Sequence, residues 1–381
     1  MKKIKKILGR LNKALGTNEL REYLANKEET TPKGAGFHLR RDEMISYKRP
    51  VRNPKVLLIG PCITIPKYMQ KRCIPPLGLC YVASALEESG INVSMIDCCV
   101  EGWDIERVDG NLVTYGLPPD QLVDRLLEGQ YDVVGVSVLF STDLPNLYEI
   151  TSTVKKILPN STIVVGGLHP TIYPKEVLSL DISYNKVKTV DFIIRGEGEH
   201  RFVDFIKLLS KGKINKKADG LVGYHNDKIF INHQRKTIEN LDDLPFPAFH
   251  LLPIEKYFEI NIPFSPVPQG DRVLPMLTTR GCPIGCSFCA NTNVWKKHRK
   301  RSVQNITEEV RYLKENFNID ELQFADDNLT FDMKFSLEKF KAIEKENILW
   351  CTPNGTMINK LTPELVEVMA NSGMYQITLS M

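Results

Sequence analysis

The chain has 381 residues, of which 42% are hydrophobic, and its formal net charge is +4. This length is enough for two or three domains with substantial cores. No apolar run approaches the roughly 18 to 20 residues that span a bilayer, and no apolar segment follows the basic N-terminus as in a signal peptide. We therefore expect a cytoplasmic protein without a transmembrane helix.

The positive charge is concentrated at the N-terminus. Residues 1–55 contain 15 Lys and Arg against 6 Asp and Glu, which leaves the rest of the chain with a net charge of −5. A nucleic-acid surface over the whole protein is therefore not expected. Four apolar side chains of this segment share one helical face: Ile4, Leu8, Leu11 and Leu15. This face can contact a membrane, but two nearby glycines weaken the helix and favour a solvated extension over residues 1–52.

The next part of the chain alternates between apolar strands and helices. Five runs have the composition of buried strands: Lys55–Gly60, Val93–Asp97, Val133–Ser137, Thr162–Gly167 and Phe192–Gly196. Such runs, separated by helices, predict an α/β domain with a doubly wound parallel sheet over residues 53–212. Ligands of these sheets bind beyond the carboxyl ends of the strands. The third, fourth and fifth runs end in Ser137 to Ser141, Gly166 to Thr171 and Arg195 to Glu199. Glycines there admit a bulky ligand or simply form tight turns.

Three cysteines stand close together in the second half of the chain, as Cys282, Cys286 and Cys289. Three thiolates on one loop can hold three irons of a 4Fe-4S cluster and leave the fourth iron open to a small chelating molecule. The alternative is a zinc site, completed by Cys351 and His298, but no second cysteine pair follows. Five other cysteines have no ligand spacing and are expected to be buried, reduced side chains: Cys62, Cys73, Cys80, Cys98 and Cys99.

Between these two regions, residues 213–268 read as a linker. Gly220 to Asn232 alternates around Asn226-Asp227 and predicts a small hairpin, and the two prolines of Leu241–Ala248 predict an extended connector. Residues 269–381 then repeat strand and helix patterns, as in a full or partial parallel barrel. The cysteine loop follows the first of these strands, and Asp326-Asp327 ends the second, where carboxylates suit a ligand ammonium or a helix cap.

The cysteine pattern, with Phe288 before the last cysteine, resembles the radical S-adenosylmethionine (SAM) superfamily. The preceding strand-end motifs, in this order, resemble the cobalamin-binding domain of one large class of these enzymes. The resemblance implies a 4Fe-4S cluster on the three cysteines and SAM near Phe288, Asp326 and Asp327. It places cobalamin against residues at the carboxyl edge of the first sheet: Ser137, Ser141, Gly166, Gly167, His169, Gly196, Glu197, Gly198 and Glu199.

The D-x-H-x-x-G motif that supplies a cobalt ligand is absent, so His169 is expected to contact the nucleotide tail or a turn. A flavodoxin-like or NAD-binding module is the alternative for this domain, but the first strand is followed by only one glycine.

The activity that the resemblance implies is methyl transfer to an unactivated carbon through a 5'-deoxyadenosyl radical. A radical rearrangement or cyclisation, or a non-catalytic cobalamin or iron-sulfur protein, remains as an alternative. A small-molecule substrate and an electron donor such as flavodoxin or ferredoxin are the expected partners. The chain ends inside what reads as the fourth strand, whereas such barrels usually have six. An incomplete, C-terminally truncated barrel is therefore expected.

Overall fold

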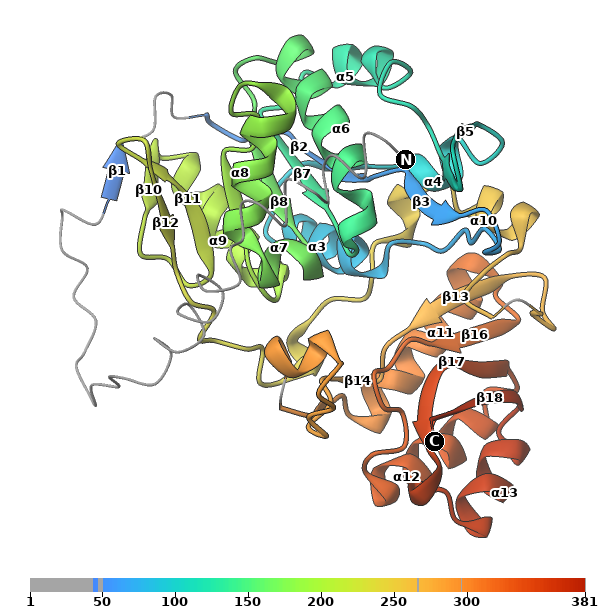
Figure 1. Ribbon diagram of the computed structural model, residues 1–381. Coiled ribbons are helices and arrows are strands. Elements are labelled where there is room, and N and C mark those ends of the chain that lie inside the picture. The colour runs from blue at the N-terminus through green and yellow to red at the C-terminus, as the bar shows by residue number, and fades with distance from the viewer. Residues whose placement is uncertain (1–43, 47–50, 266, 296, 381) are drawn as a thin grey trace, which may run out of the picture.

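The computed structural model describes residues 44–46, 51–265, 267–295 and 297–380 (Figure 1). The predicted apolar face of the N-terminal extension lies outside these residues. Within the extension, β1 (Met44–Ser46) pairs antiparallel with β10 (Lys213–Asn215). No helix of the described residues is long and apolar enough to cross a membrane.

The first domain is built on a seven-stranded sheet in the order β12-β11-β9-β8-β7-β2-β4. Its strands are β2 (Val56–Gly60), β4 (Val93–Asp97), β7 (Val133–Ser137), β8 (Thr162–Gly166), β9 (Phe192–Ile194), β11 (Leu221–His225) and β12 (Lys228–Ile231). The first five are parallel and confirm the five predicted strands. The predicted hairpin forms as β11 and β12, with positive φ at Asn226 and Asp227. It does not belong to the linker, because β11 pairs antiparallel with β9 and so extends the first sheet.

Helices cover both faces of this sheet, as a doubly wound fold requires. They are α3 (Leu77–Glu88), α4 (Cys98–Glu101), α5 (Val123–Gly129), α6 (Leu144–Ile157), α7 (Leu168–Ile172), α8 (Pro174–Asn185) and α9 (Gly198–Leu209). Helices α5, α6 and α8 pack on the face that carries Leu57 and Ile59, whereas α3 and α9 pack on the face of Val56 and Leu58. The sequence pattern explains this arrangement, since alternate residues of a strand point to opposite faces.

A small antiparallel sheet near the first domain was not predicted. It consists of β3 (Ile63–Pro66), β5 (Glu106–Asp109) and β6 (Leu112–Tyr115), in the order β3-β6-β5. These strands are short and mostly exposed or half-buried. They therefore lack the apolar runs by which buried strands are recognised in a sequence.

The second domain is a four-stranded parallel sheet in the order β13-β16-β17-β18 with intervening helices. Its elements are β13 (Val273–Met276), α11 (Val303–Phe317), β16 (Glu321–Phe324), α12 (Met333–Glu344), β17 (Leu349–Met357), α13 (Pro363–Asn371) and β18 (Met374–Ser380). This confirms the predicted run of β/α units. The cysteine loop departs after β13, and its base is a two-residue pairing of β14 (Thr279–Arg280) with β15 (Arg299–Lys300).

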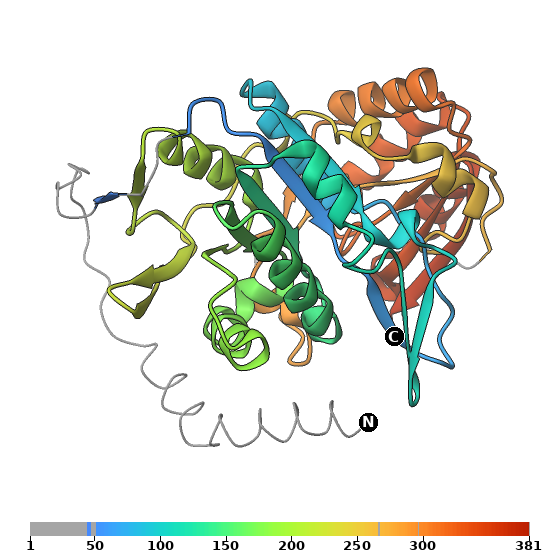
Figure 2. The same ribbon diagram turned by 90° about the horizontal axis from the view of Figure 1, so that it is seen from above.

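The two domains share one hydrophobic core. A single cluster of buried side chains runs from Leu58 and Phe202 of the first domain, through Phe249 and Tyr257 of the connector, to Phe324 of the second domain. Helix α10 (Ile254–Ile260) belongs to this connector. Figures 1 and 2 show the second domain, coloured orange to red, packed beside the first. This shared core fixes where the strand ends of the first sheet lie relative to the cysteine loop.

Candidate functional site

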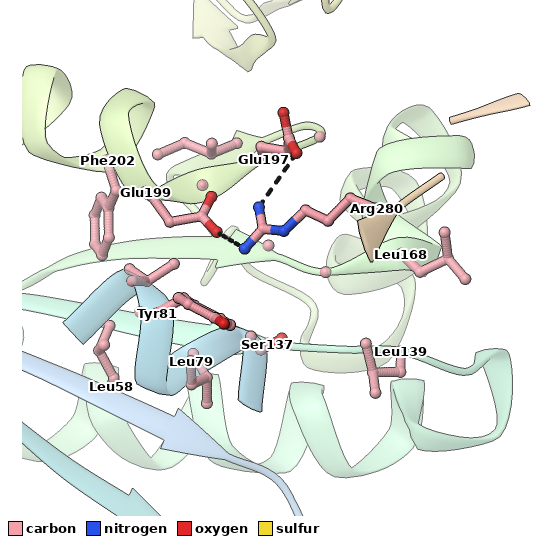
Figure 3. Close-up of a pocket in the computed structure, with 18 of the residues that line it drawn as sticks. Leu58, Leu79, Tyr81, Ser137, Leu139, Leu168, Glu197, Glu199, Phe202 and Arg280 are labelled. Atoms are coloured by element: carbon pink, nitrogen blue, oxygen red, sulfur yellow. Dashed lines mark hydrogen bonds and ion pairs between the residues drawn. The ribbon is translucent and has the colours of Figure 1, made fainter. Parts of the chain in front are cut away.

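A cavity of about 280 Å³ lies at the junction of the two domains (Figure 3). This volume is just below the range of roughly 300 to 1,000 Å³ that is usual for ligand pockets. The first domain contributes Ser137 of β7, Gly166 of β8 and the turn after β9, and the second domain contributes Thr279 to Gly281 and Asp327. The cavity is therefore lined at once by the carboxyl edge of the first sheet and by the base of the cysteine loop.

The first wall of the cavity has the shape that a bulky ligand needs. Gly78 lines it, and a Cβ atom placed there would meet no other atom within 4 Å, so the missing side chain leaves open space. Gly167 also lines it, with φ of 102°, and a Cβ atom there would come within 2.3 Å of the Val138 carbonyl oxygen. Only glycine fits that turn. Gly78 thus leaves room for a ligand on this side of the cavity, whereas Gly167 is required by the turn itself.

Most residues predicted to contact cobalamin do line this cavity. They are Ser137, Gly166, Gly167, Gly196, Glu197, Gly198 and Glu199. Ser141 and His169 are not among the lining residues, and they bond to one another instead, with 3.0 Å between Ser141 Oγ and His169 Nδ1. Burial lowers the pKa of His169 to about 4, and its Nε2 has no hydrogen-bond partner among the described residues. The assignment of both residues to cobalamin stays a prediction.

The two glutamates of the β9 turn are not simple ligand contacts. Arg280 of β14 reaches across the cavity to both, with 2.7 Å to Glu199 Oε1 and 3.2 Å to Glu197 Oε1 (Figure 3). Arg299 of β15 lies 2.8 Å from Glu197 Oε1. The Arg280 guanidinium also lies 5.0 Å from the centre of the Tyr81 ring. The turn thus binds the base of the cysteine loop through buried ion pairs.

The cysteine loop itself is the most exposed part of the site. Cys286 is exposed and Cys282 and Cys289 are partly exposed, whereas the other six cysteines are buried, as predicted for five of them. Gly281 has φ of 87°, and a Cβ atom there would come within 2.4 Å of the Lys297 carbonyl oxygen, so the loop can begin only with glycine. Accessible thiols on a tight loop are the donor set that a 4Fe-4S cluster requires.

No three His, Cys, Asp or Glu side chains of the described residues are grouped to hold a single metal ion. A 4Fe-4S cluster binds each cysteine through a different iron, so its ligands need not converge on one point. The two residues considered for zinc are not part of any such group among the described residues. Cys351 is buried on β17, where burial raises its pKa to about 11, and the His298 ring lies 4.9 Å from that of Phe331.

The two carboxylates at the end of β16 have different surroundings. Asp326 is only 1% exposed and accepts hydrogen bonds from the Thr278 hydroxyl at 2.8 Å and the Thr279 hydroxyl at 2.6 Å. Asp327 lines the cavity and accepts a hydrogen bond from Asn291 Nδ2 at 2.5 Å. Burial and the neighbouring Asp326 raise the pKa of Asp327. Of the predicted pair, Asp327 is therefore the carboxylate that faces the cavity, whereas Asp326 holds the strand that leads to the cysteine loop.

The placement of Phe288 near SAM stays a prediction. Its side chain is 90% exposed, and it is absent from the cavity lining. Tyr81, Arg280 and Trp295 are among the cavity-lining residues that sequence reasoning missed. Arg280 directly precedes Gly281 and Cys282 in the cysteine motif, so its position was a usable signal. Tyr81 and Trp295 carry no signal beyond lying near a predicted ligand site.

Comparison with known protein families agrees with this geometry. A model described as "B12 binding domain" matches residues 70–206, and one described as "Radical SAM superfamily" matches residues 276–381. The first match contains the glycine-rich strand ends, and the second contains the three cysteines and both aspartates. The two matches meet at the cavity.

Individual proteins are similar over most of this chain. It is 34% identical over 354 residues to cytidylyl-2-hydroxyethylphosphonate methyltransferase of Streptomyces wedmorensis, over 86% of this chain and 65% of that protein. It is 24% identical over 315 residues to the anaerobic magnesium-protoporphyrin IX monomethyl ester cyclase of Cereibacter sphaeroides, over 80% and 46%. The chain thus spans about half to two thirds of the length of these curated relatives.

A solved structure has the same arrangement of domains. The radical S-adenosylmethionine methyltransferase TsrM of Kitasatospora setae, with cobalamin and a 4Fe-4S cluster bound, aligns with a TM-score of 0.64. The alignment has 15% sequence identity and covers 86% of this chain and 59% of that one. At this identity the likeness is one of fold.

Proposed function

This chain belongs to the cobalamin-binding radical SAM family, and from that premise we propose that it takes part in methyl transfer to an unactivated carbon of a small molecule. The observation that carries the proposal is the cavity, because residues of both family domains line it together. A site of this kind lets one protein hold two cofactors face to face. The methyltransferase relative supports the choice of reaction.

Each cofactor has a set of residues that would hold it. Cys282, Cys286 and Cys289 would bind three irons of the cluster, and the glycine-rich strand ends would hold cobalamin. Asp327 would accept a hydrogen bond from the SAM amino group, because it is the carboxylate that lines the cavity beside the cysteine loop. When bound, the cluster would supply the electron for reductive cleavage of SAM, and cobalamin would supply the methyl group.

The protein's own residues perform the binding and the positioning. Tyr81, Leu58 and Phe202 give the first-domain side of the cavity apolar surface, which excludes water from reactive groups (Figure 3). Burial, with Asp326 beside it, makes the Asp327 carboxyl easier to protonate, so a cationic partner is what would keep it ionised. The shared core of the two domains would fix the distance between the cofactors.

We also propose a cytoplasmic location and a reducing protein partner such as flavodoxin or ferredoxin, because cluster ligation needs reduced thiolates and the reaction needs an electron. Both relatives named above are enzymes, which disfavours a non-catalytic role. The cyclase relative supports one alternative, a radical cyclisation without methyl transfer.

The test uses the full chain, reconstituted anaerobically with iron and sulfide and loaded with hydroxocobalamin. We expect one cluster and one cobalamin per chain, and, after reduction with SAM present, 5'-deoxyadenosine and methylated cobalamin. Failure to bind cobalamin would overturn the proposal. Formation of 5'-deoxyadenosine without methylated cobalamin would favour the cyclisation alternative.

A further inference from the structure

Four buried charged side chains join the two walls of the cavity. Glu197 occupies the N-cap position of helix α9 of the first domain and Glu199 lies in the first turn of that helix, whereas Arg280 and Arg299 come from the β14–β15 pair in the second domain. Exposed fractions of these side chains are 3% and 5% for the glutamates and 14% and 3% for the arginines. We call these four residues the junction cluster.

The charges of the junction cluster balance, two against two. Burial alone would raise the pKa of Glu199, but Arg280, together with the Glu199 backbone amide and His200, holds the pKa below its usual value. Burial likewise opposes the charge of Arg280, yet Glu199, Tyr81 and Glu197 raise its pKa. Both groups therefore stay ionised over the physiological pH range. Separating such a buried pair leaves an uncompensated charge, so a shift of one wall without the other is costly.

Each half of the junction cluster is adjacent in sequence to residues proposed to bind one of the cofactors. Arg280 is followed directly by Gly281 and Cys282, and its backbone pairs with Arg299 at the base of the cysteine loop. Glu197 and Glu199 lie in the cavity lining among the glycines assigned to cobalamin. The Glu197 carboxylate also accepts the Ile238 amide at 2.8 Å, which ties the connector to the same point.

One acceptor of the junction cluster is left for a ligand. Glu199 is 4% exposed and lines the cavity, and its Oε2 accepts no hydrogen bond from another described residue. Its other oxygen, Oε1, is held by Arg280. A buried acceptor without a partner is costly, and a donor on a bound ligand would remove that cost. The ligand that fills the cavity would therefore contact the same carboxylate that positions the cysteine loop.

Resting on the function proposed above, we propose that Arg280 is a positioning residue that couples the two cofactor sites. Iron ligation orders the cysteine loop and with it Arg280, Arg280 fixes Glu199, and Glu199 meets the ligand in the cavity. Binding at either site then raises the affinity of the other, because coupling between sites is reciprocal.

The experiment titrates hydroxocobalamin by absorbance into the full chain, once without and once with the reconstituted 4Fe-4S cluster. In the parent protein we expect the cluster to tighten cobalamin binding by at least roughly fivefold, the lower end of usual coupling. In Arg280→Lys and in Glu199→Gln we expect the ratio of the two cobalamin dissociation constants, without and with the cluster, to fall close to one. Both variants keep much of the side-chain volume, and lysine keeps the charge but cannot bridge two carboxylates as a guanidinium does.

Arg311→Lys is the matched control. Arg311 forms an ion pair of 2.7 Å with Glu346, the same separation as Arg280 and Glu199, but within the second domain and with its side chain 59% exposed. The Arg311→Lys variant should keep the parent protein's ratio of cobalamin dissociation constants. Thermal unfolding of each apoprotein variant and its iron content check that fold and cluster are retained.

The outcomes separate this inference from the proposed function. Cobalamin that binds equally well with and without the cluster in the parent protein overturns the coupling and leaves the function standing. A parental ratio retained by both Arg280→Lys and Glu199→Gln overturns the role of the junction cluster. No cobalamin binding at all in the parent overturns both.

Discussion

The two walls of the cavity are held in different ways. The wall of the first domain is the edge of a sheet, in which β2, β7, β8 and β9 are joined by continuous parallel hydrogen bonding with helices on both faces. The wall of the second domain is a loop whose base is a two-residue strand pair. Beyond that pair, the loop is held by backbone hydrogen bonds, such as the one from the Cys282 amide to the Trp295 carbonyl at 3.2 Å, and by side chains, namely the junction cluster and Asp327 with its bond to Asn291.

The sheet wall therefore acts as the scaffold of the site, and the loop wall carries its reactive groups. A sheet edge supported by a core has many cooperative contacts, so single changes there alter stability but leave its position unchanged. A loop held by a few polar contacts depends on each of them and on any metal cluster that it binds. We therefore expect substitutions in the loop wall to change cofactor content and affinity, and substitutions in the sheet wall to change stability.

The largest effect expected is loss of the iron-sulfur cluster on Cys286→Ala. Cys286 is exposed on the loop, so the substitution leaves no cavity in the core, but it removes one of three thiolate ligands. Iron and sulfide analysis after anaerobic reconstitution should show that most of the cluster is lost. Cys351→Ala, at a buried cysteine of β17, is the control and should retain the cluster. Full cluster content in Cys286→Ala would remove the main distinction between the two walls.

The sequence predicted the sheet wall better than the loop wall. The apolar run Val133–Ser137 identifies β7 because a strand buried on both faces has few alternatives, and its last residue, Ser137, does line the cavity. The roles of Glu197 and Asp326 were not predictable in the same way. Each depends on partners 47 to 102 positions away in the chain, such as Arg299 and Thr279. No local pattern encodes such pairings.

The two aspartates at the end of β16 are expected to have different roles in the loop wall. We expect Asp327→Asn to weaken SAM binding by about 1.5 to 3 kcal/mol, or one to two decades, because a charge-assisted contact to an ammonium is lost. Asp326→Asn should leave SAM affinity closer to wild type and instead lower the free energy of unfolding by about 1 to 3 kcal/mol, since its buried bonds to Thr278 and Thr279 are disturbed.

Calorimetric titration of SAM and thermal unfolding of the same preparations measure both effects. Cluster content is determined for each variant, because Asp327 also contacts the loop through Asn291. Equal SAM affinity in both variants and wild type would mean that the pair serves only to hold the loop.

The first domain also has, outside the cavity lining, a buried carboxyl whose charge opposes folding. Asp97 ends β4 and is 3% exposed, and burial raises its pKa from the ordinary 3.8 to about 7, although it accepts bonds from Tyr257 and the Cys99 amide. Between about pH 4 and 7 the folded protein therefore holds a proton that the unfolded chain releases. Stability should fall as pH rises through this window, by about 1.4 kcal/mol per pH unit for one proton.

Asp97→Asn should make that decline shallower by this amount, as measured by urea unfolding from pH 4.5 to 7. Some slope should remain, because burial also raises the pKa of Asp143 to about 7. Asp143→Asn is therefore the matched variant, and the double variant should be the flattest. An unchanged slope in Asp97→Asn would show that this carboxyl is already ionised in the folded protein.

The smallest effect on stability is expected at Phe288, next to Cys289 on the loop. Its ring is 90% exposed, so Phe288→Ala should change the free energy of unfolding of the apoprotein by no more than about 0.5 kcal/mol. An exposed aromatic ring beside cluster ligands has apolar surface that a bound ligand can cover, and we expect the same variant to weaken SAM binding to the cluster-loaded protein.

Val267→Ala, at an apolar side chain 60% exposed outside the loop, is the control and should change neither quantity. If Phe288→Ala instead destabilises the apoprotein while SAM affinity stays unchanged, the ring supports the loop itself, and the loop wall is less dependent on its ligands than we infer.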